Sequence, residues 1–372
     1  MLRGCGETEI APPSPCAAEG WPRSGACGTA EGFSTHCAEV LQAPSLRGML
    51  MTVYSVLPVH GILLASELRR LGADEHELRN AAKGGELARL HRGAYVPLSD
   101  FEQWTAWERY KMRCLAAALS SRTAPVLSHL SAAVVWGVPT FGVPPGQVHV
   151  LATLAAGTRT EHGFTRHAVR DSGLDVAVID GIAVTSFVRT LVEFSATAPF
   201  DAAIAALDWA LIPSTSRAIK RFTTRAELSA CAERLGRFRG KPAFNRALAF
   251  ASPLSESVGE SVSRANMHLL GFPDPVLQQE FSDAAGFIGR CDFWWEEYNQ
   301  IGEFDGKGKY LREEFLRGAS PGEVVVAEKQ REDRLRATAT RPGVTRWGWD
   351  TAVDPSKLSA HLRAAGIRPA TV

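Results

Sequence analysis

Between residues 61 and 97 the spacing of apolar residues changes from a helical period to a strand-like one, and this change restricts the fold more than any other feature of the chain. Residues 61–72 carry a helical apolar stripe that ends at a glycine. Asp74, with Glu77 three residues later, has the spacing of a capping box and predicts a second helix over 75–84.

A short two-stranded ribbon is expected next, because residues 87–96 place apolar side chains on both sides of the turn Arg92-Gly93. Helix, tight turn, helix and ribbon in this order are typical of a winged helix-turn-helix, which we assign to residues 53–98. In such a domain the second helix enters the major groove of duplex DNA, and the ribbon touches the backbone or the minor groove.

Basic and amide side chains fall at the points of this region where DNA contacts would need them. Long cations suit phosphates, whereas amide, imidazole and guanidinium groups also suit base edges. A small helical module with solvated charges explains the same residues about equally well, because the local excess of positive charge is weak. The candidate DNA-binding residues are His76, Arg79, Asn80, Lys83, Arg89, His91 and Arg92.

The composition of the whole chain narrows the classes of protein that remain. Hydrophobic residues make up 45% of the 372 residues and the formal net charge is +1, which fits a folded protein and argues against DNA binding by bulk charge. No apolar run reaches the length of a transmembrane helix, so we expect no membrane partner. The seven cysteines form no CxxC pair, which favours a reducing, cytoplasmic location.

Residues 1–48 differ from the rest of the chain. They are rich in Pro, Gly, Ala and Ser and show no helical or strand period. Such a segment buries too little apolar surface to offset the entropy lost on ordering. We therefore expect it to be disordered, or to lie upstream of a true start near Met49 or Met51.

The middle of the chain, residues 101–250, alternates helical and strand-like patterns and predicts a mixed α/β domain. Between Arg217 and Arg246, nine basic residues accompany only two acidic ones. This stretch is either a loop that follows DNA phosphates or a solvated linker between domains.

The C-terminal part, residues 253–372, predicts a helix, three successive strands, a further strand at 324–329 and a helix after it. This order describes the core of the restriction-endonuclease-like fold. The whole chain is therefore expected to be an α+β multidomain protein: a winged helix-turn-helix, a mixed α/β middle domain and a restriction-endonuclease-like domain.

Acidic residues of this C-terminal part form a candidate metal site. Glu303 and Asp305 are two residues apart and so share one face of a strand. Phosphodiester hydrolysis uses a hard cation such as Mg²⁺ held by carboxylates, with a further cation near the developing charge. The candidate catalytic residues are Asp292, Glu303, Asp305 and Lys307, and the candidate metal ligands are Asp292, Glu303, Asp305 and Glu260. The alternatives are a helix cap for Glu260 and, for the others, a fold skeleton with an inactive or DNA-binding site.

Three blocks of the sequence resemble a known family. Residues 63–97 resemble the N-terminal winged-helix domain of the AbiEi-like antitoxins of type IV toxin–antitoxin systems, and SHLSAAVVWGVP with IAVTSFVRTLVEF is similar to the domain that follows in actinobacterial proteins of this group. The tail, with EFDGKGKY and EKQREDRL, resembles a domain related to very-short-patch-repair endonucleases. The resemblance implies a transcriptional autoregulator that binds double-stranded DNA and has a nucleotidyltransferase-type toxin as partner.

Three functions are compatible with these patterns. The leading hypothesis is a DNA-binding transcriptional regulator that uses the helix at 75–84 and the ribbon at 87–96. A Mg²⁺-dependent endonuclease built on the acidic residues is the second. An interaction protein that neutralises a toxin by direct contact is the third.

Overall fold

The computed structural model describes residues 61–370, except 71, 73, 154–157, 162, 170–174, 214–221, 307–329, 332, 336 and 339. Its contacts divide the chain into Met1–Ala43 and Pro44–Val372, and every described residue belongs to the second unit. The expectations for residues 1–48, for the strand at 324–329 and for Lys307 lie outside the described residues. No helix in the described part of the chain is long and apolar enough to cross a membrane.

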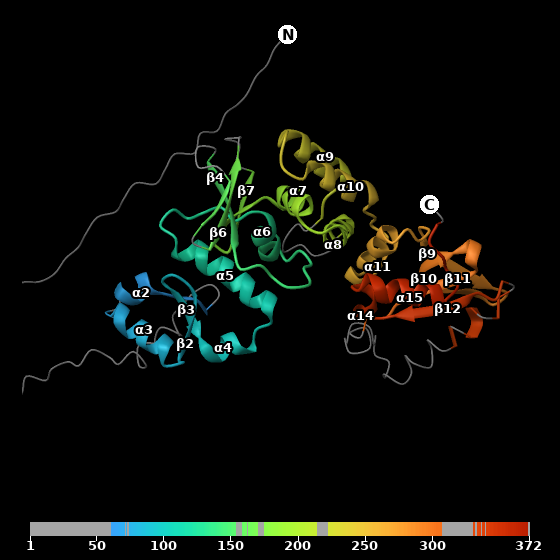
Figure 1. Ribbon diagram of the computed structural model, residues 1–372, viewed down its shortest axis with the longest axis horizontal. Coiled ribbons are helices and arrows are strands. Elements are labelled where there is room, and N and C mark those ends of the chain that lie inside the picture. The colour runs from blue at the N-terminus through green and yellow to red at the C-terminus, as the bar shows by residue number, and fades with distance from the viewer. Residues whose placement is uncertain are drawn as a thin grey trace, which may run out of the picture. The chain divides into compact units, whose positions relative to one another are not determined.

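The described elements confirm the α+β class, with many helices and several small sheets (Figure 1). The first of these sheets has the strand order β1-β3-β2, with antiparallel pairing throughout. Two helices precede the β2–β3 hairpin. The elements are β1 (Leu63–Leu64), α2 (Ala65–Arg70), α3 (Glu75–Lys83), β2 (Leu87–His91) and β3 (Ala94–Pro97).

The hairpin uses both of its faces for packing, because side chains alternate across a strand. Leu87 and Tyr95 contact the small core under α2 and α3. Leu90 and Val96 belong instead to the large core that continues into the middle of the chain. The hairpin therefore joins the N-terminal helices to the rest of this unit through buried apolar surface.

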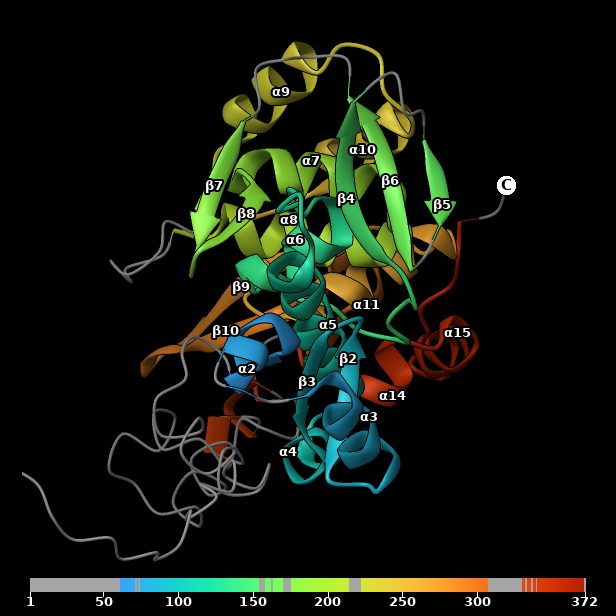
Figure 2. The ribbon, with the colours of Figure 1, turned by 90° about the vertical axis from the view of Figure 1, so that its left-hand side faces the viewer.

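The middle of the chain combines two small sheets with seven helices among the described residues. In one sheet β4 pairs in parallel with β6, and β6 pairs antiparallel with β5; in the other, β7 and β8 are antiparallel (Figure 2). The strands are β4 (Val148–Thr153), β5 (Arg159–Glu161), β6 (Phe164–Val169), β7 (Val176–Ile179) and β8 (Ile182–Thr185). The helices are α4 (Leu98–Gln103), α5 (Ala106–Ser120), α6 (His129–Trp136), α7 (Phe187–Thr197), α8 (Phe200–Leu211), α9 (Arg225–Arg234) and α10 (Lys241–Phe250).

Residue Leu127 links these two sheets. It forms bridges to Val150 on β4 and to Val184 on β8. The next residue, Ser128, donates its backbone N–H to the carbonyl of His149, 3.0 Å away. The start of α6 is thereby fixed between β4 and β8, and its buried side chains pack against α7.

The C-terminal sheet has the order β12-β11-β10-β9. The three strands β9 to β11 form an antiparallel meander, and β12 runs parallel to β11. A core of apolar and aromatic residues, among them Phe293 and Trp347, lies between this sheet and its helices. The elements are α11 (Val258–Leu269), β9 (Val276–Asp283), β10 (Gly286–Trp295), β11 (Gln300–Phe304), β12 (Gly343–Trp347), α14 (Trp349–Ala352) and α15 (Pro355–Ala364), with a short 3-10 turn at Glu296–Tyr298.

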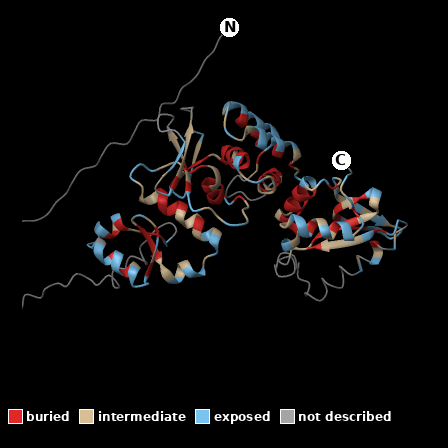
Figure 3. Cartoon of the chain, in the orientation of Figure 1, coloured by how far each residue is buried: buried red, intermediate tan, exposed pale blue. Residues whose placement is uncertain are grey.

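A buried ion pair connects α11 to α8. Arg264 Nη2 lies 2.8 Å from Asp208 Oδ2, and the Asp208 side chain is 0% exposed. A second oxygen of Asp208 accepts the backbone N–H of Ser252 at 2.6 Å. The Arg264 guanidinium also donates to the Phe250 carbonyl and lies over the Phe250 ring. Figure 3 shows the mainly buried character of both helices.

Candidate functional site

Helix α3 is anchored at its start and packed along one side only. Asp74 Oδ1 accepts the backbone N–H of His76, and Glu77 Oε2 accepts the backbone N–H of Asp74, each at 3.2 Å, so the predicted capping box is present. Leu78 is fully buried and Ala81 nearly so. This narrow apolar stripe holds α3 against the small core and leaves the opposite side of the helix exposed (Figure 3).

The candidate DNA-binding residues of α3 all lie on that exposed side. Arg79 and Lys83 are four residues apart, which places them on the same face of the helix. On the hairpin, Arg92 is exposed at the turn, and Arg89 is exposed with its Nε 3.4 Å from the carbonyl oxygen of His91. The exposed candidates are His76, Arg79, Asn80, Lys83, Arg89 and Arg92.

His91 departs from the expectation of a DNA-facing side chain. Its Nδ1 lies 2.9 Å from Ser120 Oγ on α5, and its ring contacts the edge of Phe164 on β6, with 5.4 Å between centroids. Burial lowers the pKa of His91, so the ring is neutral at pH 7. It therefore braces the turn end of the hairpin against the middle of the chain.

The basic stretch 217–246 is largely used inside the molecule where it is described. Both terminal nitrogens of Arg225 donate to carbonyls at the end of α10, those of Leu248 and Ala251. Three other side chains have acidic or aromatic partners: Arg234 with Asp175, Lys241 with Glu233, and Arg246 with Phe200. Most basic side chains in the described part of this stretch therefore have partners within the protein and help to hold α9 and α10 in place.

Asp292 and Glu303 lie next to each other on the C-terminal sheet. Phe293 pairs with Gly302, so the next pair in this register places Asp292 opposite Glu303, with both side chains on one face. Asp292 Oδ2 accepts the backbone N–H of Phe304 at 2.8 Å. The carboxylate thus takes a backbone donor at the point where the two strands separate.

Both oxygens of Glu303 face guanidinium groups. Arg331 Nη2 lies 2.5 Å from Oε1, and Arg346 Nε lies 3.2 Å from Oε2. Arg346 is the register partner of Glu303 on β12, so this contact crosses directly between neighbouring strands. Glu303 is only 9% exposed, and these two cations compensate the burial of its charge.

The side chain of Glu260, on α11, also reaches the C-terminal sheet. Its oxygens accept the hydroxyl of Ser257 at 2.7 Å, the backbone N–H of Glu256 at 2.9 Å and the amide of Gln278 at 3.2 Å. Gln278 lies opposite Asp292 in the register of β9 and β10. Glu260 therefore serves as a helix cap that also contacts the sheet.

The described acids are mostly engaged by protein donors in this arrangement. Glu303 and Glu260 direct their oxygens to protein donors, and Asp305 follows β11 with its N–H bound to the Trp347 carbonyl at 2.8 Å. Among the described residues, no three histidine, cysteine or acidic side chains are grouped so that they could hold a metal ion. Metal binding by these acids therefore stays a prediction.

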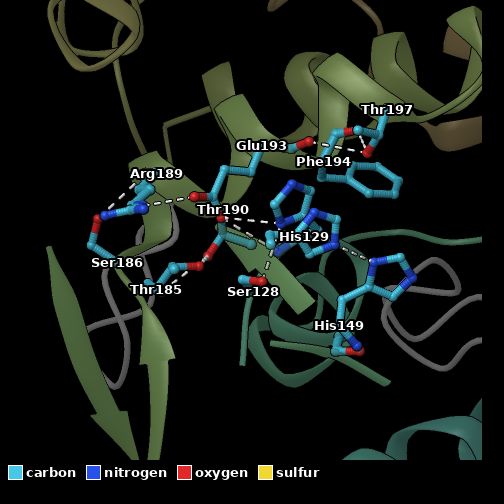
Figure 4. A network of polar contacts seen from close by, with 12 residues as sticks. Ser128, His129, His149, Thr185, Ser186, Arg189, Thr190, Glu193, Phe194 and Thr197 are labelled. Atoms are coloured by element: carbon cyan, nitrogen blue, oxygen red, sulfur yellow. Dashed lines mark hydrogen bonds and ion pairs between the residues drawn. The ribbon is translucent and has the colours of Figure 1, made fainter. Parts of the chain in front are cut away.

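The middle of the chain contains a polar cluster that sequence analysis missed (Figure 4). His149 on β4 and His167 on β6 share one face of their sheet, and His149 Nδ1 lies 2.9 Å from His167 Nε2. The ring of His129, the first residue of α6, stacks on His167 with 3.5 Å between centroids and 16° between planes. His129 also has a positive φ of 49°, which is strained for a non-glycine residue.

A buried carboxylate and guanidinium complete this cluster. Glu193 Oε1 accepts from Arg189 Nε at 2.7 Å, and Glu193 Oε2 lies 3.5 Å from both the backbone N and Nδ1 of His129. Arg189 is 1% exposed, and its Nη2 lacks a hydrogen-bond partner in the described chain. Burial raises the pKa of Glu193, and the Arg189 guanidinium opposes that rise.

All three histidines of the cluster are poor bases. Burial lowers the pKa of His129 well below its usual value, with further lowering by His167, His149 and Arg189. The pKa of His149 is lowered by burial, and that of His167 falls to about 4 through burial, His149 and Arg239. The stack is therefore uncharged at pH 7.

Comparison with known proteins adds little to these observations. No protein-family model matches the chain, and no curated protein matches it. One similar solved structure is the crystal structure of the RV2827C protein from Mycobacterium tuberculosis, at 14% sequence identity and a TM-score of 0.33. The match covers 55% of this chain and 80% of that one. A likeness of this size defines neither a family nor a function.

Proposed function

We propose that this protein binds double-stranded DNA through α3 and the β2–β3 hairpin, as a winged helix-turn-helix does. The observation that carries the proposal is the division of α3 into two sides. Leu78 and Ala81 hold the helix on its small core, while His76, Arg79, Asn80 and Lys83 project outward. An exposed helix with cations and an amide on one side matches the chemistry of a major groove and its flanking phosphates.

The surroundings of α3 support this orientation. α2 precedes it across a short turn, and the hairpin follows after Gly84-Gly85, which is the order of a winged domain. His91, directly before the turn, fixes the turn end of the hairpin on α5 and β6, and Arg92 is exposed in that anchored turn. A recognition helix and a wing held on one core can contact DNA together with little loss of entropy on binding.

The biological role that we propose is transcriptional autoregulation in the cytoplasm. This part rests on the resemblance of residues 63–97 and of the later blocks to AbiEi-like antitoxins. A nucleotidyltransferase-type toxin is the protein partner that this role implies, and toxin neutralisation by direct contact belongs to the same proposal. Co-purification with the product of a neighbouring reading frame tests the partner independently of DNA binding.

Selection of bound duplexes from a random pool tests whether the protein recognises a specific DNA sequence, as we propose. Wild-type protein should enrich a discrete site, and Asn80→Ala should relax the preference at one position by about 1–3 kcal/mol, because an amide contact to a base edge is lost. Asn245→Ala is the matched control, since Asn245 is exposed on α10 and outside the proposed surface. If wild type and Asn80→Ala enrich the same site equally, Asn80 does not contact the bases. If wild type enriches no site, the proposed role as a regulator is wrong.

An endonuclease is the second candidate function, and one observation favours it. Asp292 and Glu303 lie opposite each other on one face, and the order helix, three-stranded meander and added parallel strand matches the core of restriction-endonuclease-like domains. Incubation of plasmid DNA with Mg²⁺ should then give nicking that Asp292→Ala abolishes. Ser282→Ala, at an exposed position of β9, is a control that should nick like wild type. Nicking that survives Asp292→Ala, or none in wild type, would rule this candidate out.

A further inference from the structure

The three-histidine stack (His129, His149 and His167) connects elements that are distant in sequence. His129 begins α6, His149 belongs to β4 and His167 to β6 (Figure 4). The rings are close enough that a change of charge on one acts directly on the others, because the two contacts are 2.9 Å between nitrogens and 3.5 Å between ring centroids.

The charged groups around the stack come from the elements packed against it. On α7, Glu193 contacts His129 and is paired with Arg189. Arg239, between α9 and α10, acts on His167, and Asp175 acts on Glu193. Glu193 is already paired with Arg189, and Asp175 with Arg234, so both carboxylates among these groups have a cationic partner before any imidazolium forms in the stack.

Strand β6 links the stack to the proposed wing. Phe164 lies on β6 three residues before His167, and its ring packs against His91 at the turn end of the hairpin. Phe164 is 8% exposed and belongs to the large core, together with Leu90, Ala94 and Val96 of the hairpin. A displacement of β6 therefore changes the packing at the point where the hairpin contacts the middle of the chain.

We propose that the three-histidine stack is a proton-operated latch, closed when neutral, whose opening on protonation loosens β6 and weakens the support of the DNA-binding hairpin. The proposal rests on the proposed DNA-binding function for its effect on affinity. The latch itself rests only on the geometry of the stack and on the contact between Phe164 and His91.

The chemistry of the rings explains the direction of the switch. In the neutral state one of the facing nitrogens of His149 and His167 carries the hydrogen and the other accepts it. When both rings are protonated, both nitrogens are donors and the bond is lost. The two charged rings, whose facing nitrogens lie 2.9 Å apart, then also repel each other.

The sign of the pH dependence follows from the lowered pKa values. An opened, solvated histidine titrates near 6.5, whereas the pKa of His167 in the closed stack is about 4. Protons therefore bind the open state more tightly. The closed state is fully favoured above about pH 6.5 and loses that advantage between pH 6.5 and 4, by up to about ten-fold per pH unit for each histidine.

Hydrogen exchange followed by mass spectrometry tests the latch without DNA. In the full-length wild-type protein, exchange in β6, corrected for the intrinsic effect of pH, should rise steeply from pH 7.5 to 4.5. The variants His149→Gln and His167→Gln should each flatten that rise, because glutamine keeps a hydrogen-bonding group and does not titrate. His361→Gln is the control, since His361 lies on α15, outside the stack. A wild-type profile for β6 that does not change with pH overturns the proposal.

Duplex affinity over the same pH range tests the coupling. We expect wild-type affinity to fall as β6 opens, and the fall to be reduced in His149→Gln. Affinity that stays level or rises while β6 opens overturns the coupling. If no duplex binding occurs at any pH, the DNA-binding function fails, and hydrogen exchange still decides the latch.

Discussion

Replacing Arg264 by methionine should destabilise the protein by about 3–5 kcal/mol, since it leaves a buried carboxylate without its counter-charge. Asp208 is 0% exposed, and burial raises its pKa while Arg264 lowers it. Without the guanidinium, Asp208 keeps the N–H of Ser252 and the side-chain hydrogen bond of Ser261, both uncharged, and must become protonated or draw in water. Urea unfolding at pH 7, followed by tryptophan fluorescence, measures the loss.

The double variant Asp208→Asn with Arg264→Met is the matched test of this cause. Asparagine can accept the Ser252 N–H without a charge, so the double variant should regain much of the stability that the single variant loses. The loss in Arg264→Met should also shrink as the pH is lowered towards the pKa of Asp208. A double variant as unstable as Arg264→Met would show that packing on Phe250, and not the charge, is what Arg264 contributes.

Removal of Arg79 and Arg92 together should weaken duplex binding by about 100-fold. Each contact to a base or phosphate contributes about 1–3 kcal/mol, and 1.4 kcal/mol corresponds to a ten-fold change. The two residues lie on α3 and at the hairpin turn, so they report on both proposed DNA contacts. Fluorescence anisotropy of a labelled duplex at fixed salt measures the change.

Arg363→Ala combined with Arg368→Ala controls for net charge. Both residues are exposed, one on α15 and one just after it, and the double substitution removes the same charge as the test variant. The control should bind DNA within about two-fold of wild type, because long-range effects of exposed charges are screened at physiological salt. Equal losses in the two double variants would mean that binding follows bulk charge, with no defined surface.

Local sequence signals predicted the parts of the fold that local chemistry determines. Asp74 and Glu77 form the capping box that starts α3, and the glycines after Lys83 end it. The C-terminal meander could also be predicted from the sequence, because its three strands follow one another with short connections. The strand expected at 324–329 lies outside the described residues, and β12, Gly343–Trp347, was not predicted. β12 pairs in parallel with β11, and this contact between segments distant in sequence cannot be predicted from a local pattern.

The candidate sites likewise combine features that the local sequence predicts with features that only tertiary packing determines. Exposure of Arg79 and Lys83 follows from helical periodicity once Leu78 is recognised as the buried position. The partners of Glu303 could not be predicted, since Arg331 and Arg346 reach it only through tertiary packing. The histidine cluster depends on the register of β4 with β6. Its one local signal was Arg189 followed by Glu193 four residues later, inside an otherwise uncharged helix.

The dependence of duplex affinity on salt tests the central claim most directly. The chain has a net charge of only +1, so DNA binding must come from a local cationic surface. We predict that the wild-type affinity falls steeply and linearly on a log–log plot between 50 and 200 mM salt, with a slope that becomes about one unit shallower for each phosphate-contacting cation removed from α3 or the hairpin. Affinity that does not depend on salt, or a slope left unchanged by Arg79→Ala and Lys83→Ala together, would contradict the assignment of this surface to DNA.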